Sequence, residues 1–251
     1  MSVSLPEKFI SRMRAQLQEE YHLFIEALNE EPPVSIRLNR GRHFTIPEKS
    51  APCAWEANAF YLKERPSFTY DPNFHSGAYY VQEASSMLIG RVLDMLDMSY
   101  WNLIIDLCAA PGGKTTHLLD KCPESVFVLA NEVVKTRLGA LKHNLIKWGK
   151  SNCAVISHSV ENIAATGLNA DLVLVDAPCS GEGLFRKDNE SIKHWSEKNL
   201  SICEHRQEDI LSHVTGLVKE AGYLIYSTCT FNPNENIEQL NKLVESGYFE
   251  S

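Results

Sequence analysis

Two cysteines, Cys179 and Cys229, each follow a run of residues that is typical of a buried strand. Cys179 closes the segment 171–179, Asp-Leu-Val-Leu-Val-Asp-Ala-Pro-Cys, and Cys229 closes the segment 222–229, Gly-Tyr-Leu-Ile-Tyr-Ser-Thr-Cys. Short apolar runs between turn residues are typical of strands that are buried on both faces, as in a parallel sheet. Because ligands of open α/β sheets bind beyond the carboxyl ends of the strands, we expect both thiols at that edge. The pair indicates covalent chemistry by one cysteine with help from the other.

A second candidate for chemistry is the turn 108–115, Cys-Ala-Ala-Pro-Gly-Gly-Lys-Thr, which follows a predicted strand at 101–107. A glycine-containing turn between a strand and its helix usually approaches a nucleotide-like ligand. A phosphate-binding P-loop would need a glycine five positions before Gly113, where the chain has Cys108, and the dinucleotide pattern G-x-G-x-x-G is absent. The Gly-Gly-Lys-Thr sequence therefore does not indicate an ATPase.

Glu132 ends the next predicted strand, 126–132. An acidic residue about twenty positions beyond such a turn can accept hydrogen bonds from ribose hydroxyls. Taken alone, Glu132 is explained equally well as a solvated carboxylate at the end of a strand. Together, a glycine turn, a carboxylate for a ribose and the lack of a phosphate cradle favour an adenosine ligand without phosphates. S-adenosylmethionine is the cofactor that these features indicate.

The elements that would position these residues alternate between helix and strand from Gln82 onward. This alternation predicts an α/β fold, a parallel sheet with helices on both faces. The predicted helices are at about 83–97, 114–121, 134–148, 199–219 and 234–246, and the predicted strands are at 101–107, 126–132, 154–157, 171–176 and 222–227.

The N-terminal part predicts a small α+β domain at 1–75, followed by the catalytic domain at 76–251. Residues 5–28 have apolar side chains at steps of three and four, which is typical of one amphipathic helix. Residues 34–39 alternate in polarity like a half-buried strand. The proline-rich stretch 40–78 predicts loops.

The composition, 44% hydrophobic and 22% charged, is ordinary for a soluble globular protein. No apolar run approaches the about 18 residues of a membrane span, and the first residues lack the pattern of a secretory signal. We therefore expect a cytoplasmic protein, monomeric and without a membrane partner. The seven scattered cysteines include no Cys-x-x-Cys pair, so we expect most of them to be free thiols. The nine histidines show no metal spacing, so we expect no metal site. The net charge of -8 argues mildly against nucleic-acid binding over the whole surface, but it does not exclude a local basic groove.

Four segments, in order, resemble the RNA cytosine-C5 methyltransferases of the Nop/Sun type. They are Tyr-Val-Gln-Glu-Ala-Ser-Ser-Met at 80–87, the turn at 108–116, Asp-Ala-Pro-Cys-Ser-Gly-Glu-Gly at 176–183 and Ser-Thr-Cys-Thr at 227–230. Leu-Pro-Glu-Lys-Phe at 5–9 and Arg-Leu-Asn at 37–39 are similar to the bacterial ribosomal-RNA branch of that family. The resemblance spans nearly the whole chain. It implies a Rossmann-like methyltransferase sheet that uses S-adenosylmethionine, with a small N-terminal α+β domain.

The resemblance implies transfer of a methyl group to C5 of cytosine in RNA, and it favours ribosomal RNA as the substrate. Cytosine C5 becomes a nucleophile only after a thiolate adds to C6. The family assigns this attack to Cys229 and product release to Cys179. Cytosine-C5 DNA methyltransferases instead attack from a Pro-Cys motif, so chemistry alone leaves Cys179 as a rival nucleophile. The family also implies that Asp176 contacts the cofactor or the cytosine, and that Lys114 orients one of them. The target base must be unstacked to reach such a site.

The cofactor site implied by the resemblance combines the turn, two strand-end carboxylates and one position after the third strand. That last position is Ser159, where the family commonly has an aspartate near the adenine, so a contact there would be weaker. The full set is Cys108, Ala109, Ala110, Pro111, Gly112, Gly113, Lys114, Glu132, Ser159 and Asp176.

Two alternatives stay open. One is the same reaction on transfer RNA, and the other is a catalytically silent RNA-binding or ribosome-assembly factor. The lysines and arginines of the helix 134–148 could contact phosphate, although a solvated helix face is favoured. Methyltransferase sheets of this class normally add two strands after the fifth, whereas only 247–251 follow the last predicted helix. We therefore expect the C-terminal part of the fold to be missing and the strand 222–227 to be an unprotected edge.

Overall fold

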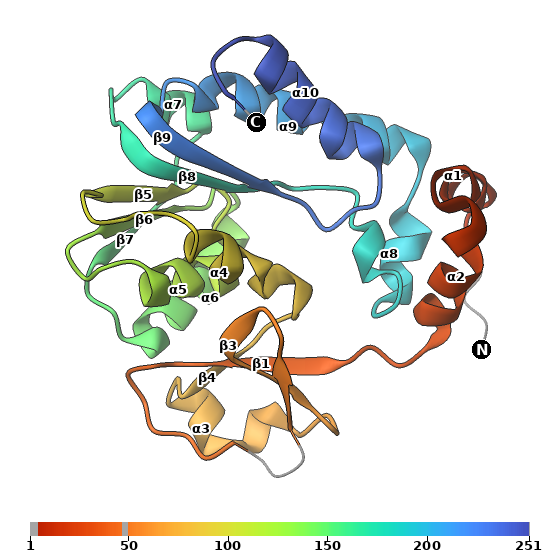
Figure 1. The fold of residues 1–251 in the computed structure, drawn as a ribbon, viewed down its shortest axis with the longest axis horizontal. Helices are drawn as coiled ribbons and strands as arrows, with labels where there is room; N and C mark the ends of the chain where they lie inside the picture. Colours follow the sequence, from red (N-terminus) through yellow and green to blue (C-terminus); the bar gives the residue numbers. More distant parts are fainter. Residues whose placement is uncertain (1–4, 47–49, 251) are drawn as a thin grey trace. The chain divides into compact units, whose positions relative to one another are not determined.

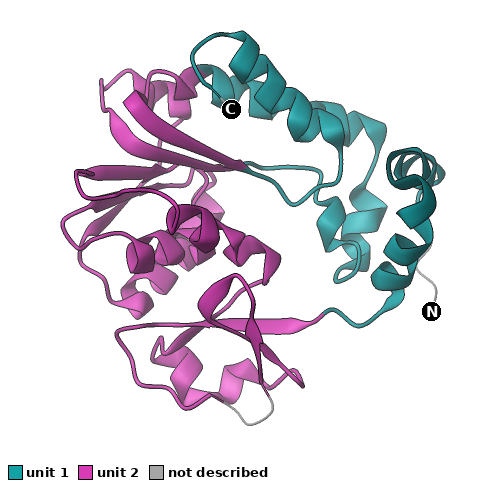
Figure 2. Cartoon of the chain, viewed as in Figure 1, with its two compact units in different colours: residues 1–32, 177–212, 227–251 teal, residues 33–176, 213–226 magenta. Residues whose placement is uncertain are grey.

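A computed structural model of the protein describes residues 5–46 and 50–250. It contains two sheets, one with the strand order β2-β3-β1-β4 and one with the order β7-β6-β5-β8-β9 (Figure 1). The predicted loop positions 47–49 lie outside the described residues. The chain divides into two compact units: unit 1 is 1–32, 177–212 and 227–251, and unit 2 is 33–176 and 213–226 (Figure 2).

The five-stranded sheet of unit 2 confirms the predicted α/β class. Its strands are β5 (Leu103–Asp106), β6 (Phe127–Asn131), β7 (Cys153–Ile156), β8 (Ala170–Asp176) and β9 (Val218–Ser227, of which Ser227 belongs to unit 1). β5 pairs in parallel with β6 and with β8, so that Ile105 lies between Leu129 and Val173. β8 is buried from Ala170 to Val175 because it is an interior strand with apolar side chains on both faces.

Three helices pack on this sheet through apolar side chains. They are α4 (Leu88–Leu93), α5 (Gly113–Lys121) and α6 (Lys135–Trp148), which contribute Leu93, Leu118 and Leu141 to the same buried cluster as Ile104 and Val128. The predicted helix 83–97 was too long, because a short turn, η3 (Ser85–Met87), precedes α4 and the helix ends at Leu93. Asp97 explains part of this difference, because its carboxylate accepts hydrogen bonds from the backbone and hydroxyl of Ser99 and stabilises a turn instead.

The second sheet of unit 2 is antiparallel and includes residues that the sequence predicted as loop. β1 (Val34–Leu38) pairs with β3 (Glu56–Leu62) and with β4 (Tyr79–Val81), and β3 pairs with β2 (Ala51–Cys53). The loop prediction was therefore wrong for β2 and β3. Pro52 is tolerated because β2 is an edge strand, where a missing N–H costs no ladder hydrogen bond.

The remaining elements of unit 2 are short: η2 (Phe68–Tyr70), α3 (Pro72–His75) and α7 (Val160–Ala164). β4 lies beyond residue 75, the predicted end of the N-terminal domain, and nevertheless completes the antiparallel sheet. The division into domains at 1–75 and 76–251 stays a prediction.

Unit 1 begins with two helices where the sequence predicted one at 5–28. α1 (Glu7–Leu17) and α2 (Tyr21–Asn29) are separated by η1 (Gln18–Glu20), and Gln18 has a φ of 48°. In an unbroken helix Phe9 and Phe24 would be about 22 Å apart. The break brings their ring centroids to 6.2 Å in a cluster with Phe185. Burial of aromatic side chains thus outweighs helix continuity here.

The other elements of unit 1 are η4 (Glu182–Leu184), α8 (Asn189–His194), α9 (Glu197–Val214), η5 (Pro233–Glu235) and α10 (Ile237–Glu245); the last two residues of α9 belong to unit 2. α9 ends before the predicted residue 219 because Gly216 begins a turn into β9. Over residues 5–46 and 50–250, every helix is too short or too polar to span a membrane.

Candidate active site

The predicted glycine turn connects β5 to α5 in unit 2. Gly112 caps α5 in the left-handed region, with φ 108° and ψ 6°, which strongly favours glycine. A Cβ there would also lie 3.3 Å from Leu141 Cδ1. The Asp106 carboxylate, at the end of β5, accepts a 2.7 Å hydrogen bond from Thr115 Oγ1 and so holds the start of α5 from inside. Burial raises the pKa of Asp106 to about 7.

Lys114 and Asp176 form an ion pair beside this turn. Lys114 Nζ lies 2.8 Å from Asp176 Oδ2, and the two side chains retain 16% and 34% of their exposure. Lys114 comes from the first turn of α5 and Asp176 is the last residue of β8, so the parallel sheet brings them together from positions far apart in the sequence. A partly exposed pair of this kind can still change partners when a ligand arrives.

Cys108 is surrounded by negative charge rather than activated. Burial first, and then the carboxylates of Asp106, Glu132 and Asp176, raise the pKa of its thiol to about 12. Because the thiolate is the nucleophilic form of cysteine, Cys108 is inert at neutral pH. Both Glu132 and Asp176, two other predicted site residues, are thus within electrostatic range of Cys108.

Glu132 is 2% exposed and lies one residue past the end of β6. Its Oε1 accepts a 2.8 Å hydrogen bond from the Val134 amide, and its Oε2 forms an ion pair at 3.2 Å with Arg137. Oε2 is buried and has no hydrogen-bond partner of its own. The Arg137 guanidinium compensates the charge of Oε2, and a ribose hydroxyl would be a suitable donor to complete its hydrogen bonding.

From the sequence, Arg137 was predicted only as one of the basic residues on a solvated helix face. In the structure its guanidinium donates to the Ala110 carbonyl and forms the ion pair with Glu132, so that it joins the turn to the strand-end carboxylate. The signal that could have identified it is its spacing, five residues after Glu132 and in the first turn of the following helix.

Ser159 caps α7. Its Oγ accepts a 3.3 Å hydrogen bond from the Asn162 amide, as expected of a serine at the start of a helix. The preceding amide, that of His158, donates to Asn131 Oδ1 at 3.0 Å, which ties this segment to the end of β6. The contact of Ser159 with adenine stays a prediction.

The two predicted thiols are in contact within unit 1. Cys179 Sγ lies 3.2 Å from Cys229 Sγ, and the Cys229 amide donates to Cys179 Sγ at 3.3 Å. Cys229 is exposed, whereas Cys179 is partly buried. The hydrogen bond with Cys229, together with burial, raises the pKa of Cys179 far above that of an ordinary thiol. Cys179 therefore keeps its proton at neutral pH.

The Cys229 backbone is held closely from the other segment. The Gly183 amide donates a 2.8 Å hydrogen bond to the Cys229 carbonyl. A Cβ at Gly183 would lie 2.9 Å from that oxygen, so the approach needs glycine. This contact explains why Gly183 is useful in the segment that follows Cys179.

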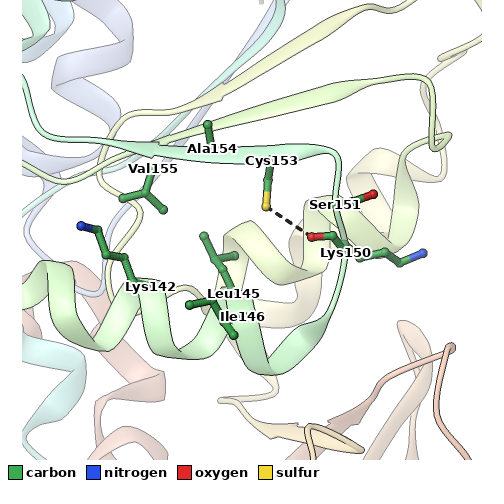
Figure 3. A pocket seen from close by; sticks show the side chains of 8 residues that line it. All are labelled: Lys142, Leu145, Ile146, Lys150, Ser151, Cys153, Ala154 and Val155. Carbon is green, nitrogen blue, oxygen red and sulfur yellow. Dashed lines mark hydrogen bonds between the residues drawn. The ribbon is translucent and has the colours of Figure 1, made fainter.

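A separate cavity of about 300 Å³ lies between α6 and β7 in unit 2 (Figure 3). Its lining includes Lys142, Ile146 and Cys153, and none of the predicted site residues. The Cys153 thiol points toward the Lys150 carbonyl at 3.7 Å, and burial raises its pKa (Figure 3). Nothing in the lining indicates chemistry. Among the described residues, no group of three or more His, Cys, Asp or Glu side chains could hold a metal ion.

Comparison with known families identifies the chain. The family described as 16S rRNA methyltransferase RsmB/F matches residues 93–247, and the N-terminal domain of 16S rRNA methyltransferase RsmF matches residues 5–84. The chain belongs to the RsmB/F family of 16S rRNA methyltransferases. The predicted membership in the bacterial ribosomal-RNA branch of the Nop/Sun type is thereby confirmed.

Named members of the RsmB/F family and solved structures agree with this assignment. The chain is 31% identical to ribosomal RNA small subunit methyltransferase F from Vibrio parahaemolyticus, over 98% of the chain and 54% of that protein. It thus spans about half the length of the curated relatives it matches. A methyltransferase homolog protein from Pyrococcus horikoshii is 26% identical, with a TM-score of 0.81 over 97% of this chain and 79% of the other. NSun6 from Pyrococcus horikoshii, solved with SFG, is 18% identical, with a TM-score of 0.82 over 98% of this chain and 89% of the other, and shows the same fold.

Proposed function

We propose that this chain transfers a methyl group from S-adenosylmethionine to C5 of cytosine in ribosomal RNA, through a covalent bond between Cys229 and C6 of the base. The observation that carries the proposal is the 3.2 Å contact between the two sulfurs, of which that of Cys229 is exposed and that of Cys179 is partly buried. Membership in a family of 16S rRNA methyltransferases supports the substrate.

The unequal surroundings of the two thiols support their roles. The exposed Cys229 sulfur, which faces the proton of Cys179, is the sulfur that can be a thiolate and add to C6. Its electron pair forms the S–C6 bond, and the C5–C6 π electrons become available at C5 for the methyl group. Water then takes the C5 proton, the electrons of the C5–H bond re-form the C5–C6 double bond, and the S–C6 bond breaks with its electron pair returning to Cys229. A protonated thiol at 3.2 Å from that sulfur can donate to it as the negative charge returns, which is a role for Cys179 in product release.

The cofactor proposal is supported by the fit of the residues in unit 2. S-adenosylmethionine would supply an electrophilic methyl group. The buried Glu132 Oε2 would accept a hydrogen bond from a ribose hydroxyl, and the backbone from Cys108 to Gly113 would line the adenosine. Lys114 and Asp176 would exchange part of their ion pair for contacts with the cofactor or the base.

The test uses the whole chain, ribosomal RNA and cofactor with a labelled methyl group. We expect Cys229→Ala to lose methylation by at least about 1000-fold because the nucleophile is gone. We expect Cys179→Ala to accumulate a protein–RNA adduct that survives denaturing electrophoresis. Cys153→Ala is the matched control, since its partly buried thiol lies in the separate cavity, and it should behave as the wild type.

If an adduct formed with Cys229→Ala but not with Cys179→Ala, Cys179 would be the nucleophile and Cys229 would act in product release. Transfer RNA is assayed in parallel. If transfer RNA is methylated and ribosomal RNA is not, the substrate is transfer RNA instead of ribosomal RNA. Binding of RNA without any 5-methylcytosine would support the silent alternative.

A further inference from the structure

A fully buried carboxylate, Glu235, lies between the segments that carry the two thiols. It belongs to η5, six residues after Cys229, and its relative exposure is 0%. From the sequence, Glu235 was predicted only to lie at the start of the helix 234–246. A buried carboxylate is tolerated only where hydrogen-bond donors surround it.

Hydrogen-bond donors converge on both oxygens of Glu235. Oε1 accepts from Ser180 Oγ at 2.6 Å and from Asn232 Nδ2 at 3.2 Å. Oε2 accepts from the Ser180 amide at 2.8 Å and from Gln207 Nε2 at 3.1 Å. All of these residues belong to unit 1.

These contacts join the segment of Cys179 to the segment of Cys229. Ser180 directly follows Cys179, and its hydroxyl also lies 2.8 Å from Thr230 Oγ1, directly after Cys229. Gln207, on α9, donates to the Pro178 carbonyl at 3.0 Å as well as to Glu235. The carboxylate therefore holds the residues on both sides of Cys179 and connects them to Thr230.

We infer that Glu235 is a positioning residue that sets the distance between the two thiols. It touches neither sulfur in these contacts and acts through Ser180, Gln207 and Thr230. The catalytic meaning of this role rests on the proposed function, but the positioning itself does not.

The charge state of the side chain is essential to this role. An amide NH₂ group in place of Oε2 would face two N–H donors, the Ser180 amide and Gln207 Nε2. In place of Oε1 it would face the donor Asn232 Nδ2 and would require the Ser180 hydroxyl to accept instead of donate. Glu235→Gln therefore changes almost no volume and breaks the network on one side. The Ser180 segment would then shift relative to Thr230, and the sulfurs would separate.

The experiment measures how fast Cys179 and Cys229 form a disulfide with diamide, which takes up two electrons and two thiol protons as the S–S bond forms. No RNA or methyl donor is needed. We expect Glu235→Gln to slow this reaction by about tenfold, the effect of one lost charged hydrogen bond. We also expect the alkylation of Cys229 by iodoacetamide at pH 7 to fall, because Cys179 no longer donates to it.

Glu204→Gln is the matched control. Glu204 also accepts from Asn232 Nδ2, at 3.3 Å, but it has no such bond to Ser180, so the disulfide rate should stay that of the wild type. Thr230→Val, with almost unchanged volume, removes the two contacts of the Thr230 hydroxyl, with Ser180 Oγ and with the Asn232 amide, leaves Glu235 in place, and should slow the reaction about threefold. It replaces Glu235→Gln as the test if that variant does not fold.

Wild-type disulfide and alkylation rates in Glu235→Gln, with only a lower melting temperature, would overturn the inference and leave Glu235 a merely structural residue. The same applies to wild-type rates in Thr230→Val. If the rates change as expected but the wild type makes no 5-methylcytosine, the proposed function fails while the positioning role stands.

Discussion

Among the cysteines, the surroundings of each residue decide its chemistry. Burial raises the pKa of Cys122 to about 11 and, with three carboxylates, that of Cys108 to about 12. Cys229 is exposed and has the Cys179 thiol beside it. Burial thus makes the thiols of Cys108 and Cys122 unreactive, whereas the exposed sulfur of Cys229 fits the nucleophilic role that we propose for it.

Two buried titratable residues, His117 and Asp106, should make the free energy of unfolding depend on pH in opposite directions. His117 lies 2.8 Å from Glu56 Oε2, and burial lowers the pKa of His117 from 6.5 to about 4. Its contribution to stability is full above pH 6.5 and is lost as the pH falls toward 4. Asp106 has a pKa raised from 3.8 to about 7, so its contribution is full below pH 3.8 and is lost as the pH rises through 7.

We therefore expect His117→Gln and Asp106→Asn to change the pH dependence of stability in opposite directions. When the pH falls from 7 to 5, protonation of His117 in the unfolded state lowers the free energy of unfolding of the wild type by about 2 kcal/mol. The variant without His117 should lose less stability than the wild type over the same pH range. Removing the carboxylate should make the protein relatively more stable at pH 7 by a similar amount. Urea unfolding at pH 5, 6 and 7 measures both differences. Parallel curves for all three proteins would contradict the assignment.

At the scale of elements, close packing of α4 depends on one glycine. A Cβ at Gly90 would lie 2.3 Å from Glu56 Oε2 on β3 and 2.5 Å from His117 Nε2 on α5. The helix can thus approach two other elements only because residue 90 has no side chain. The Glu56–His117 contact lies directly beneath it.

We expect Gly90→Ala to lower the free energy of unfolding by about 2 kcal/mol or more, because the added methyl overlaps buried polar atoms. Gly139→Ala is the matched control in α6, where nothing lies within 4 Å of the new Cβ. It should raise the free energy of unfolding by up to about 1 kcal/mol, the helix propensity difference. Urea unfolding of both variants measures the contrast, and equal effects would show that packing at Gly90 is not limiting.

At the scale of the whole molecule, unit 2 contains two sheets whose connection includes a buried ion pair. Arg37 extends from β1 of the antiparallel sheet, is 1% exposed and pairs with Asp120 of α5, which covers the parallel sheet. Arg37 also donates to Thr116 Oγ1 at 2.6 Å and to Gln82 Oε1 at 2.9 Å. Burial lowers the pKa of Arg37, although Asp120 opposes this shift.

We expect Arg37→Met to destabilise the protein by about 3–5 kcal/mol, because Asp120 would keep a buried charge without its partner. The double variant Arg37→Met with Asp120→Leu should recover much of that loss, since neither charge is then buried. A double-mutant cycle by urea unfolding measures the coupling. A double variant no more stable than Arg37→Met would show that shape, not charge, governs this contact.

The sequence by itself determined the parallel α/β class, the approximate positions of its strands and the segments that carry the site. These features follow from local periodicity and turn residues, which act over a few residues. Strands at 101–107 and 171–176 were therefore predicted close to their observed bounds, Leu103–Asp106 and Ala170–Asp176. The motifs at 108–116 and 176–183 could also be recognised from the residues alone.

Only the tertiary structure decided which groups meet and what their surroundings do to them. The break at Gln18 forms because Phe9 and Phe24 gain more from sharing a core than α1 gains from continuing. The contact between Ser180 and Glu235 joins residues 55 positions apart. Proton retention by Cys179 likewise depends on burial and on a neighbour 50 residues away. Such properties arise from desolvation and charge in a closed interior, which no local pattern of the chain can specify.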